Sequence, residues 1–321
     1  MVRGFKLLPR RIVAVVKTVF TYYVIKSREE RIMSVWTNEE LEFLKNNIDN
    51  YTNRELARIL NKTKNAVQIK ASRFGLKREE KYHYDKSFFE IIDNEYKAYW
   101  LGFIYADGYV SMTKDHRGCM MGIELQEFDY GHLEQFNIDI GGNVRIEHRH
   151  RGSRYINNYY VGESDVCSIR LFCKKIFDDL ISHGCCQNKS LIKGAPIGIP
   201  NELMRHFIRG YFDGNGSISY SYNKKVDKSY LKIAITTGSL AFANWLSKTL
   251  SDVDINNIVM QDHEHSYKVQ ISSSNKIDFL KYIYNNSKTY LQRKYNKYLS
   301  AVYGQGNVID HKLSEGEIGE G

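Results

Sequence analysis

Two stretches of the sequence carry residue types that could do hydrolytic chemistry. The first, YWLGFIYADGYV at residues 99–110, is a hydrophobic run with two glycines, and its acid Asp107 follows the run. The second, FIRGYFDGNGSI at residues 207–218, repeats the pattern, and Asn215 stands 108 positions after Asp107. A helix that served only for packing would avoid glycine, since each one costs roughly 1 kcal/mol relative to Ala. The repeated pattern therefore indicates a function for the ends of both helices.

The small residues of each predicted helix lie on one face. Ala98, Gly102 and Ala106 fall at i, i+4 and i+8, and Gly210 and Gly214 are spaced in the same way in the second copy. A face of small residues lets two helix backbones approach closely. We therefore expect the two helices to pack against each other about a pseudo-twofold axis, which would bring their polar carboxyl ends together.

The residues at these two helix ends are suited to a divalent cation. Acidic groups that converge repel one another unless a cation lies between them, and metal ions so placed can polarise a phosphodiester, activate water and stabilise a leaving oxygen. Asn215 offers an amide oxygen without negative charge, so we expect one metal site to be weakened.

The sequence around these helices predicts an α+β unit that occurs twice in the chain. Each copy begins with the glycine-bearing helix and continues as two alternating strands, a helix, two more strands and a helix, which is the order αββαββα. We expect half-domains at residues 86–192 and 200–303, each with an antiparallel sheet covered by helices on one face. The segment KGAPIGIP at residues 193–200 marks the boundary between them.

The nine-residue stretches WLGFIYADG (100–108) and IRGYFDGNG (208–216) resemble the two signatures of LAGLIDADG homing endonucleases in their single-chain, pseudo-symmetric form. The resemblance covers roughly residues 86–303. It implies two saddle-shaped sheets in the major groove of double-stranded DNA and Mg²⁺- or Mn²⁺-dependent hydrolysis of phosphodiesters across the minor groove. It also implies a monomer from a bacterial or phage mobile element that leaves short 3′ overhangs.

The resemblance further assigns roles to individual residues. The metal ligands would be the side chains at the eighth motif position and the main-chain carbonyls at the seventh: Asp107, Asn215, Ala106 and Gly214. In the family a basic residue about eighty positions downstream positions water or stabilises charge, and Lys189 and Lys294 stand at that spacing. Alternatively, Lys189 is a solvated loop lysine and Lys294 is one of several basic residues on a terminal helix.

Asn215 departs from the acid that the family has at this motif position. Three outcomes stay open: full double-strand cleavage with reduced metal affinity, preferential nicking of one strand, or DNA binding without catalysis.

Residues 34–80 predict a separate three-helix domain. Its helices begin at threonines, and Thr37 and Thr52 are each followed three residues later by Glu, which is the capping-box pattern. The apolar residues predicted to face inward are Leu41, Leu44, Leu56, Ile59, Val67 and Phe74.

The third of these helices and its flanks are basic, as in helices that enter the major groove. The pattern from Trp36 onward resembles Myb/SANT-like helix-turn-helix domains. That resemblance implies DNA contacts by Lys64, Gln68, Lys70 and Arg73. The alternative is a solvated basic helix on a packing domain.

The net charge of +9 suits a polyanionic partner. If the predicted sheets lie on DNA, their basic residues are available for phosphate and base-edge contacts. These are Arg145, His148, Arg149 and Arg151 in the first copy and Lys224, Lys225 and Lys232 in the second. Alternatively, they belong to ordinary exposed hairpins of a cationic protein.

The remaining segments limit the other possibilities. The leader at residues 1–33 contains a 14-residue, mostly apolar run, shorter than the roughly 20 residues of a membrane span, so we expect no membrane partner; translation could begin at Met33. The tail at residues 304–321 is Gly-rich and acidic and is expected to be disordered. Five cysteines without a CxxC pair fit a reducing cytosol. The rival functions are a DNA-binding regulator that has lost catalysis and an RNA maturase that assists intron splicing.

Overall fold

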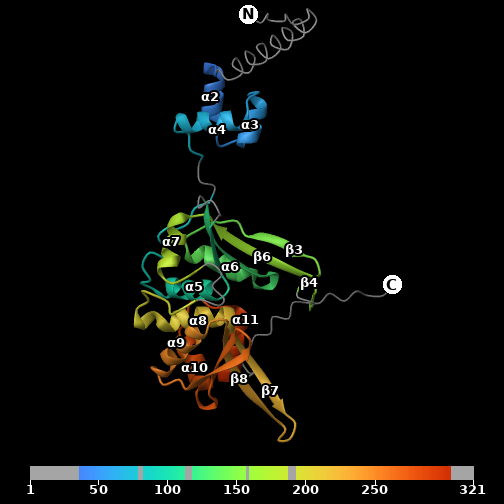
Figure 1. Ribbon diagram of the computed structural model, residues 1–321, viewed down its shortest axis with the longest axis vertical. Helices are drawn as coiled ribbons and strands as arrows, with labels where there is room; N and C mark the ends of the chain where they lie inside the picture. The colour runs from blue at the N-terminus through green and yellow to red at the C-terminus, as the bar shows by residue number, and fades with distance from the viewer. Residues whose placement is uncertain (1–35, 79–81, 113–117, 157–158, 187–192, 305–321) are drawn as a thin grey trace, which may run out of the picture. The chain divides into compact units, whose positions relative to one another are not determined.

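The computed structural model describes residues 36–78, 82–112, 118–156, 159–186 and 193–304 (Figure 1). The chain divides into two compact units, residues 1–81 and 82–321. The predicted leader, Lys189 and residues 305–321 of the predicted tail lie outside the described residues. Within the described part, no helix is long and apolar enough to cross a membrane.

Unit 1 is built from three short helices, α2 (Asn38–Asn47), α3 (Asn53–Ile59) and α4 (Lys64–Arg73). The first two helices begin with capping boxes. The side chain of Thr37 accepts from the main-chain N–H of Glu40, and the Glu40 carboxylate accepts from the N–H of Thr37. Thr52 and Glu55 make the same pair of bonds at the start of α3. Thr63 caps α4 through the N–H of Ala66. Each helix start therefore has local support in the sequence.

The core of unit 1 differs from the predicted one at three positions. Leu44, Leu56 and Val67 are buried as expected, but Leu41 is only half-buried, Ile59 is 49% exposed and Phe74 is 45% exposed. Leu60, the next residue after α3, takes the inward position. Phe74 lies beyond the last inward residue of α4, and its ring lies instead 5.1 Å from the ammonium of Lys70.

The first half of unit 2 forms a four-stranded antiparallel sheet with strand order β1-β2-β6-β3. A short hairpin of β4 and β5 interrupts the connection from β3 to β6 and was not expected from the sequence. The elements are α5 (Glu95–Ala106), β1 (Tyr109–Met112), β2 (Cys119–Gln126), η1 (Glu127–Asp129), α6 (Tyr130–Asp139), β3 (Glu147–Arg151), β4 (Arg154–Ile156), β5 (Tyr159–Val161), β6 (Ser164–Leu171) and α7 (Lys174–Ser182).

The second half repeats this plan with strand order β7-β8-β10-β9. If the separate β4–β5 hairpin is left out, the four strands of each half lie in the same order: first, second, fourth, third. The elements of the second half are η2 (Asn201–Leu203), α8 (Met204–Asn215), β7 (Gly216–Asn223), β8 (Lys228–Thr237), α9 (Leu240–Ser251), β9 (Asn257–His263), β10 (Ser266–Ile271), η3 (Ser273–Asn275), α10 (Lys276–Tyr284) and α11 (Gln292–Tyr303). The α+β fold with two four-stranded antiparallel sheets is therefore confirmed.

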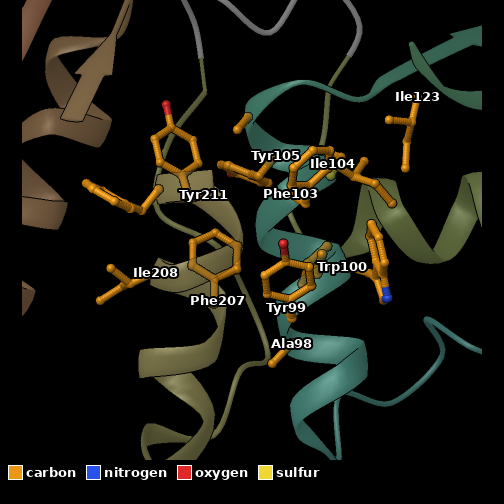
Figure 2. Packing of buried hydrophobic residues seen from close by; sticks show 14 of the residues in the cluster. Ala98, Tyr99, Trp100, Phe103, Ile104, Tyr105, Ile123, Phe207, Ile208 and Tyr211 are labelled. Atoms are coloured by element: carbon orange, nitrogen blue, oxygen red, sulfur yellow. The ribbon is translucent and has the colours of Figure 1, made fainter. Parts of the chain in front are cut away.

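The two glycine-bearing helices, α5 and α8, lie side by side at the centre of unit 2 (Figure 2). Residues 98–106 of α5 and 206–213 of α8 are buried, including polar side chains of α8. One continuous hydrophobic core includes residues of both helices, both sheets and the covering helices. The seam between α5 and α8 is thus the element that joins the two halves.

A candidate active site at the paired helix ends

The backbones of α5 and α8 touch where each helix carries its glycine. A Cβ added to Gly102 would lie 2.0 Å from the carbonyl oxygen of Phe207, and one added to Gly210 would lie 1.9 Å from the carbonyl oxygen of Tyr99. No real Cβ tolerates such distances from a main-chain atom. Glycine is therefore required at both positions by the close approach of the helices.

The seam continues to the carboxyl ends of both helices. A Cβ on Gly214 would lie 2.4 Å from the Cβ of Ala106 and 3.3 Å from Oδ2 of Asp107. Asp107 is the C-cap of α5 and is exposed, whereas residues 98–106 of α5 before it are buried. The Asp107 carboxylate is thus presented to solvent beside the next-to-last residue of α8.

Asn215 is the last residue of α8 and is half-buried. Its Nδ2 donates to the hydroxyl of Tyr211 at 3.3 Å. The same hydroxyl accepts a 2.6 Å hydrogen bond from Nζ of Lys193. Burial raises the pKa of Tyr211 to about 12, so the phenol is neutral at physiological pH. With Nδ2 engaged, the Oδ1 atom of Asn215 is the one left to act as an acceptor or ligand.

Lys294 covers the carboxyl end of α8. It stands in the first turn of α11, is 4% exposed, and its Nζ donates to the carbonyl oxygens of Phe212 (2.7 Å), Asp213 (2.6 Å) and Gly214 (3.3 Å). A cation at this end of a helix complements the exposed carbonyls. Burial lowers the pKa of Lys294 to about 8, which leaves the ammonium mostly protonated at pH 7.

Lys193, which was not among the predicted site residues, has a related position at the end of α5. It is 4% exposed, and besides its bond to Tyr211 its Nζ lies 3.4 Å from the carbonyl oxygen of Tyr105. Lys193 opens the segment KGAPIGIP, which was predicted only to mark the boundary between the halves. The family spacing favours Lys189, which lies outside the described residues.

The oxygen atoms predicted to bind metal at the two helix ends are of the type that a hard divalent cation takes. The candidates are the Asp107 carboxylate, Oδ1 of Asn215 and the main-chain carbonyls of Ala106 and Gly214, all of which are oxygen ligands of the kind Mg²⁺ takes. Among the described residues no group of three or more His, Cys, Asp or Glu side chains could hold a metal ion. A cation here would therefore depend on one formal negative charge, neutral oxygens, water and the phosphates of a nucleic acid.

The basic residues of β3 that were predicted to contact DNA are paired with acids. Arg149 lies 2.5 Å from Glu124, and the Arg151 guanidinium reaches the same carboxylate. Nδ1 of His148 lies 2.8 Å from Glu127. Arg145, just before β3, is exposed. The acidic partners thus offset part of the positive charge on this strand.

The predicted residues of the second half are placed on the longest hairpin. Lys224 and Lys225 lie in the turn between β7 and β8, and Lys232 is exposed on β8. Figure 1 shows this hairpin projecting beyond the helices of its half. In unit 1, Lys64, Gln68 and Arg73 are exposed on α4. The ammonium of Lys70 lies 5.8 Å from the Trp36 ring, besides its contact with Phe74.

Comparison with known proteins agrees with this description for part of the chain. Residues 202–284, within the second half of unit 2, match the family model of the LAGLIDADG-like domain. No curated protein matches the chain. Three similar solved structures are LAGLIDADG meganuclease I-AabMI bound to uncleaved DNA, I-DmoI in complex with DNA and Mn, and meganuclease I-SmaMI bound to uncleaveable DNA. Their sequence identities to this chain are 14%, 20% and 12%, and their TM-scores are 0.46, 0.39 and 0.41, in that order. The matches cover 66%, 60% and 64% of this chain and 91%, 98% and 88% of the other chains.

Proposed function

We propose that the protein is a site-specific, metal-dependent endonuclease of the LAGLIDADG type that acts on double-stranded DNA. The observation that carries the proposal is the junction of α5 and α8, where Gly214 lies against the exposed carboxylate of Asp107. An exposed acid at the end of a buried helix seam, with a buried lysine at each helix end, is an arrangement suited to phosphodiester hydrolysis. The matched LAGLIDADG-like domain supports the same class.

In this proposal the chain's own residues hold and orient the reacting groups. Asp107 and Asn215, with the carbonyls of Ala106 and Gly214, would bind Mg²⁺ or Mn²⁺. When bound, the metal would polarise the scissile phosphate and lower the pKa of an attacking water. Lys294 would place a fixed positive charge near the reacting phosphate, since it is held at the end of α8 by three carbonyls.

DNA contact would come from the two sheets and from unit 1. The exposed cations of the β7–β8 hairpin and Arg145 would contact phosphates, which position a protein on DNA without reading sequence. Unit 1 would act as a Myb/SANT-like helix-turn-helix module, with Lys64, Gln68 and Arg73 of α4 facing DNA. A protein of this kind would act as a monomer, because both halves of the site lie in one chain.

One specific observation favours a second candidate, a DNA-binding protein with weak or no cleavage. Asn215 supplies no charge, and the positive Nζ of Lys294 lies 3.3 Å from the Gly214 carbonyl that would be a ligand. Both features weaken the affinity of this site for a cation. Nicking of one strand would be the intermediate case.

A plasmid assay tests the proposal. Purified protein is incubated with supercoiled plasmids that carry candidate intron-insertion sites, with Mg²⁺, Mn²⁺ or EDTA. Linear product that needs metal and is absent with Asp107→Ala supports the endonuclease. Binding to a site without cleavage supports the regulator, and faster splicing of an intron RNA without DNA cleavage supports the maturase. Linear product that survives Asp107→Ala would remove Asp107 from the active site.

A further inference from the structure

The sixth position of each motif carries a different residue, Tyr105 in α5 and Asp213 in α8, and both side chains are buried. Asp213 stands two residues before Asn215 in the sequence, and it does not reach the cation site. Its carboxylate accepts three hydrogen bonds, from the hydroxyls of Tyr99 (2.7 Å) and Tyr284 (2.5 Å) and from the main-chain N–H of Leu291 (2.7 Å). All three donors come from outside α8.

The bond to Leu291 links Asp213 to Lys294. Leu291 is the N-cap of α11, and its carbonyl oxygen accepts from the N–H of Lys294 at 2.9 Å in the first turn of that helix. The Asp213 carboxylate therefore lies at the amino end of α11, where a negative charge is favourable. The main-chain carbonyl of the same Asp213 accepts a 2.6 Å bond from Nζ of Lys294. Asp213 thus contacts the segment that carries Lys294 at two points.

Tyr105 makes the corresponding connection in the first half. Its hydroxyl lies 3.0 Å from the carbonyl oxygens of both Gly184 and Gly194, and Gly194 directly follows Lys193. The main-chain carbonyl of Tyr105 faces Nζ of Lys193, as that of Asp213 faces Nζ of Lys294. In both halves the sixth motif residue therefore anchors the segment that brings a buried lysine to the helix end.

We propose that Asp213 is a positioning residue that holds Lys294 at the carboxyl end of α8. The effect of this positioning on DNA cleavage rests on the proposed function, but the placement of the lysine does not. Three donors converge on one buried carboxylate, and of these only the Leu291 N–H belongs to the segment that carries Lys294. Removing the Leu291 N–H should therefore displace Lys294, whereas removing the Tyr99 hydroxyl should affect only the stability of the core. Comparing the two separates the positioning of Lys294 from general stabilisation.

The matched variants differ in which bond they remove. Asp213→Leu keeps the branched shape of the side chain but removes both of its acceptor oxygens. Leu291→Pro removes the N–H, at a backbone φ of −78° that proline accepts, and also replaces the buried leucine side chain. Leu291→Ala keeps the N–H and is the matched control for that lost packing. Tyr99→Phe deletes a different donor to the same carboxylate and serves as the control. Asp213→Asn keeps an acceptor oxygen and tests whether a conservative change rescues the effect.

The first readout is the Lys294 ammonium in the DNA-free protein. In ¹⁵N-lysine-labelled protein we expect a slowly exchanging ammonium signal, assigned because Lys294→Met removes it. The signal should be lost in Asp213→Leu and in Leu291→Pro, and should persist in Tyr99→Phe and Asp213→Asn. The inference would be overturned if the Lys294 ammonium signal persisted in folded Asp213→Leu or folded Leu291→Pro. It would also be overturned if Tyr99→Phe lost the signal to the same extent.

The second readout is single-turnover cleavage of a target site at saturating protein. A misplaced catalytic group costs on the order of 100-fold in rate, so Asp213→Leu and Leu291→Pro should lower the rate by that factor without changing DNA affinity. Tyr99→Phe should keep the rate. If wild-type protein cleaves nothing while the ammonium signals follow the expected pattern, the positioning role is supported and only the proposed endonuclease fails.

Discussion

Gly102 of α5 faces Phe207 of α8 so closely that a methyl group on Gly102 would lie 2.0 Å from the Phe207 carbonyl oxygen. Because that oxygen belongs to the backbone of a buried helix, it cannot move aside as a flexible side chain would. Gly102→Ala must push the two helices apart or unfold the seam. We expect a loss of more than about 3 kcal/mol in the free energy of unfolding, measured by urea denaturation.

A glycine elsewhere in unit 2 provides the control for this prediction. Gly131 in α6 has no heavy atom within 4 Å of an added Cβ. Gly131→Ala should therefore leave stability unchanged or raise it by up to about 1 kcal/mol, because alanine favours the helix. Equal effects of the two substitutions would contradict the close approach at Gly102.

The sequence was sufficient to predict this seam but not the contacts around it. Glycines at a fixed offset and the order of helices and strands follow from local patterns, and both appear in the fold. Lys193 could not be found because its role depends on contacts with Tyr105 and Tyr211, which are distant in the sequence and which spacing alone does not determine. The pairing of Arg149 and Arg151 with Glu124 likewise joins strands that are distant in sequence.

Unit 1 illustrates a different limit of sequence prediction. The capping boxes at Thr37 and Thr52 are local and were predicted correctly. Ile59 and Phe74 were expected inside and are exposed, because they stand at helix ends where one residue of rotation changes the direction of a side chain. Helix starts are therefore easier to predict than the inward positions of a helix that ends after two turns.

The unequal charges of Asp107 and Asn215 predict how cleavage responds to substitution. Asp107→Asn removes the one formal negative charge of the proposed donor set, and we expect cleavage to fall by at least about 100-fold, which corresponds to roughly 2.7 kcal/mol. Binding to the same DNA should remain. The measurement is single-turnover cleavage beside an electrophoretic binding assay.

The reciprocal change, Asn215→Asp, should strengthen metal binding. We expect half-maximal cleavage at a lower Mg²⁺ concentration and more linear product relative to nicked circles, because a second carboxylate adds charge to the donor set. Asn286→Asp, on an exposed turn of the same half, is a control for the added charge. An unchanged or higher Mg²⁺ requirement in Asn215→Asp would contradict a metal site at these helix ends.

Stability in acid should depend on His132. This imidazole is buried among Trp100 and Phe103, and its Nε2 lies 3.0 Å from the Tyr99 hydroxyl. Burial lowers the pKa of His132 to about 3, with further lowering from the charges of Arg293 and Lys294. In the unfolded chain the pKa is near 6.5. The unfolded state therefore binds the proton first, and stability is lost as the pH falls below about 6.5 toward 3.

From His132 alone, the free energy of unfolding should decrease by roughly 2 kcal/mol between pH 7 and pH 5. His132→Gln should remove that part of the pH dependence of unfolding, while His83→Gln, at an exposed position, should not. Urea denaturation of the three proteins at both pH values gives the comparison, and contributions from other groups cancel in the difference. Parallel curves for wild type and His132→Gln would show that His132 does not titrate on unfolding.

The β7–β8 hairpin should contribute to DNA affinity through charge. Lys224 and Lys225 stand in its turn, and both are exposed. If each contacts a phosphate, replacing both with alanine should reduce the slope of log affinity against log salt by about 1.8, since each phosphate contact contributes about 0.9. Affinity should fall by a similar factor for target and non-target DNA, because phosphate contacts carry no sequence information. Lys174→Ala, whose ammonium pairs with Asp178 on α7, is the control. A salt slope unchanged by the double substitution would place this hairpin away from DNA.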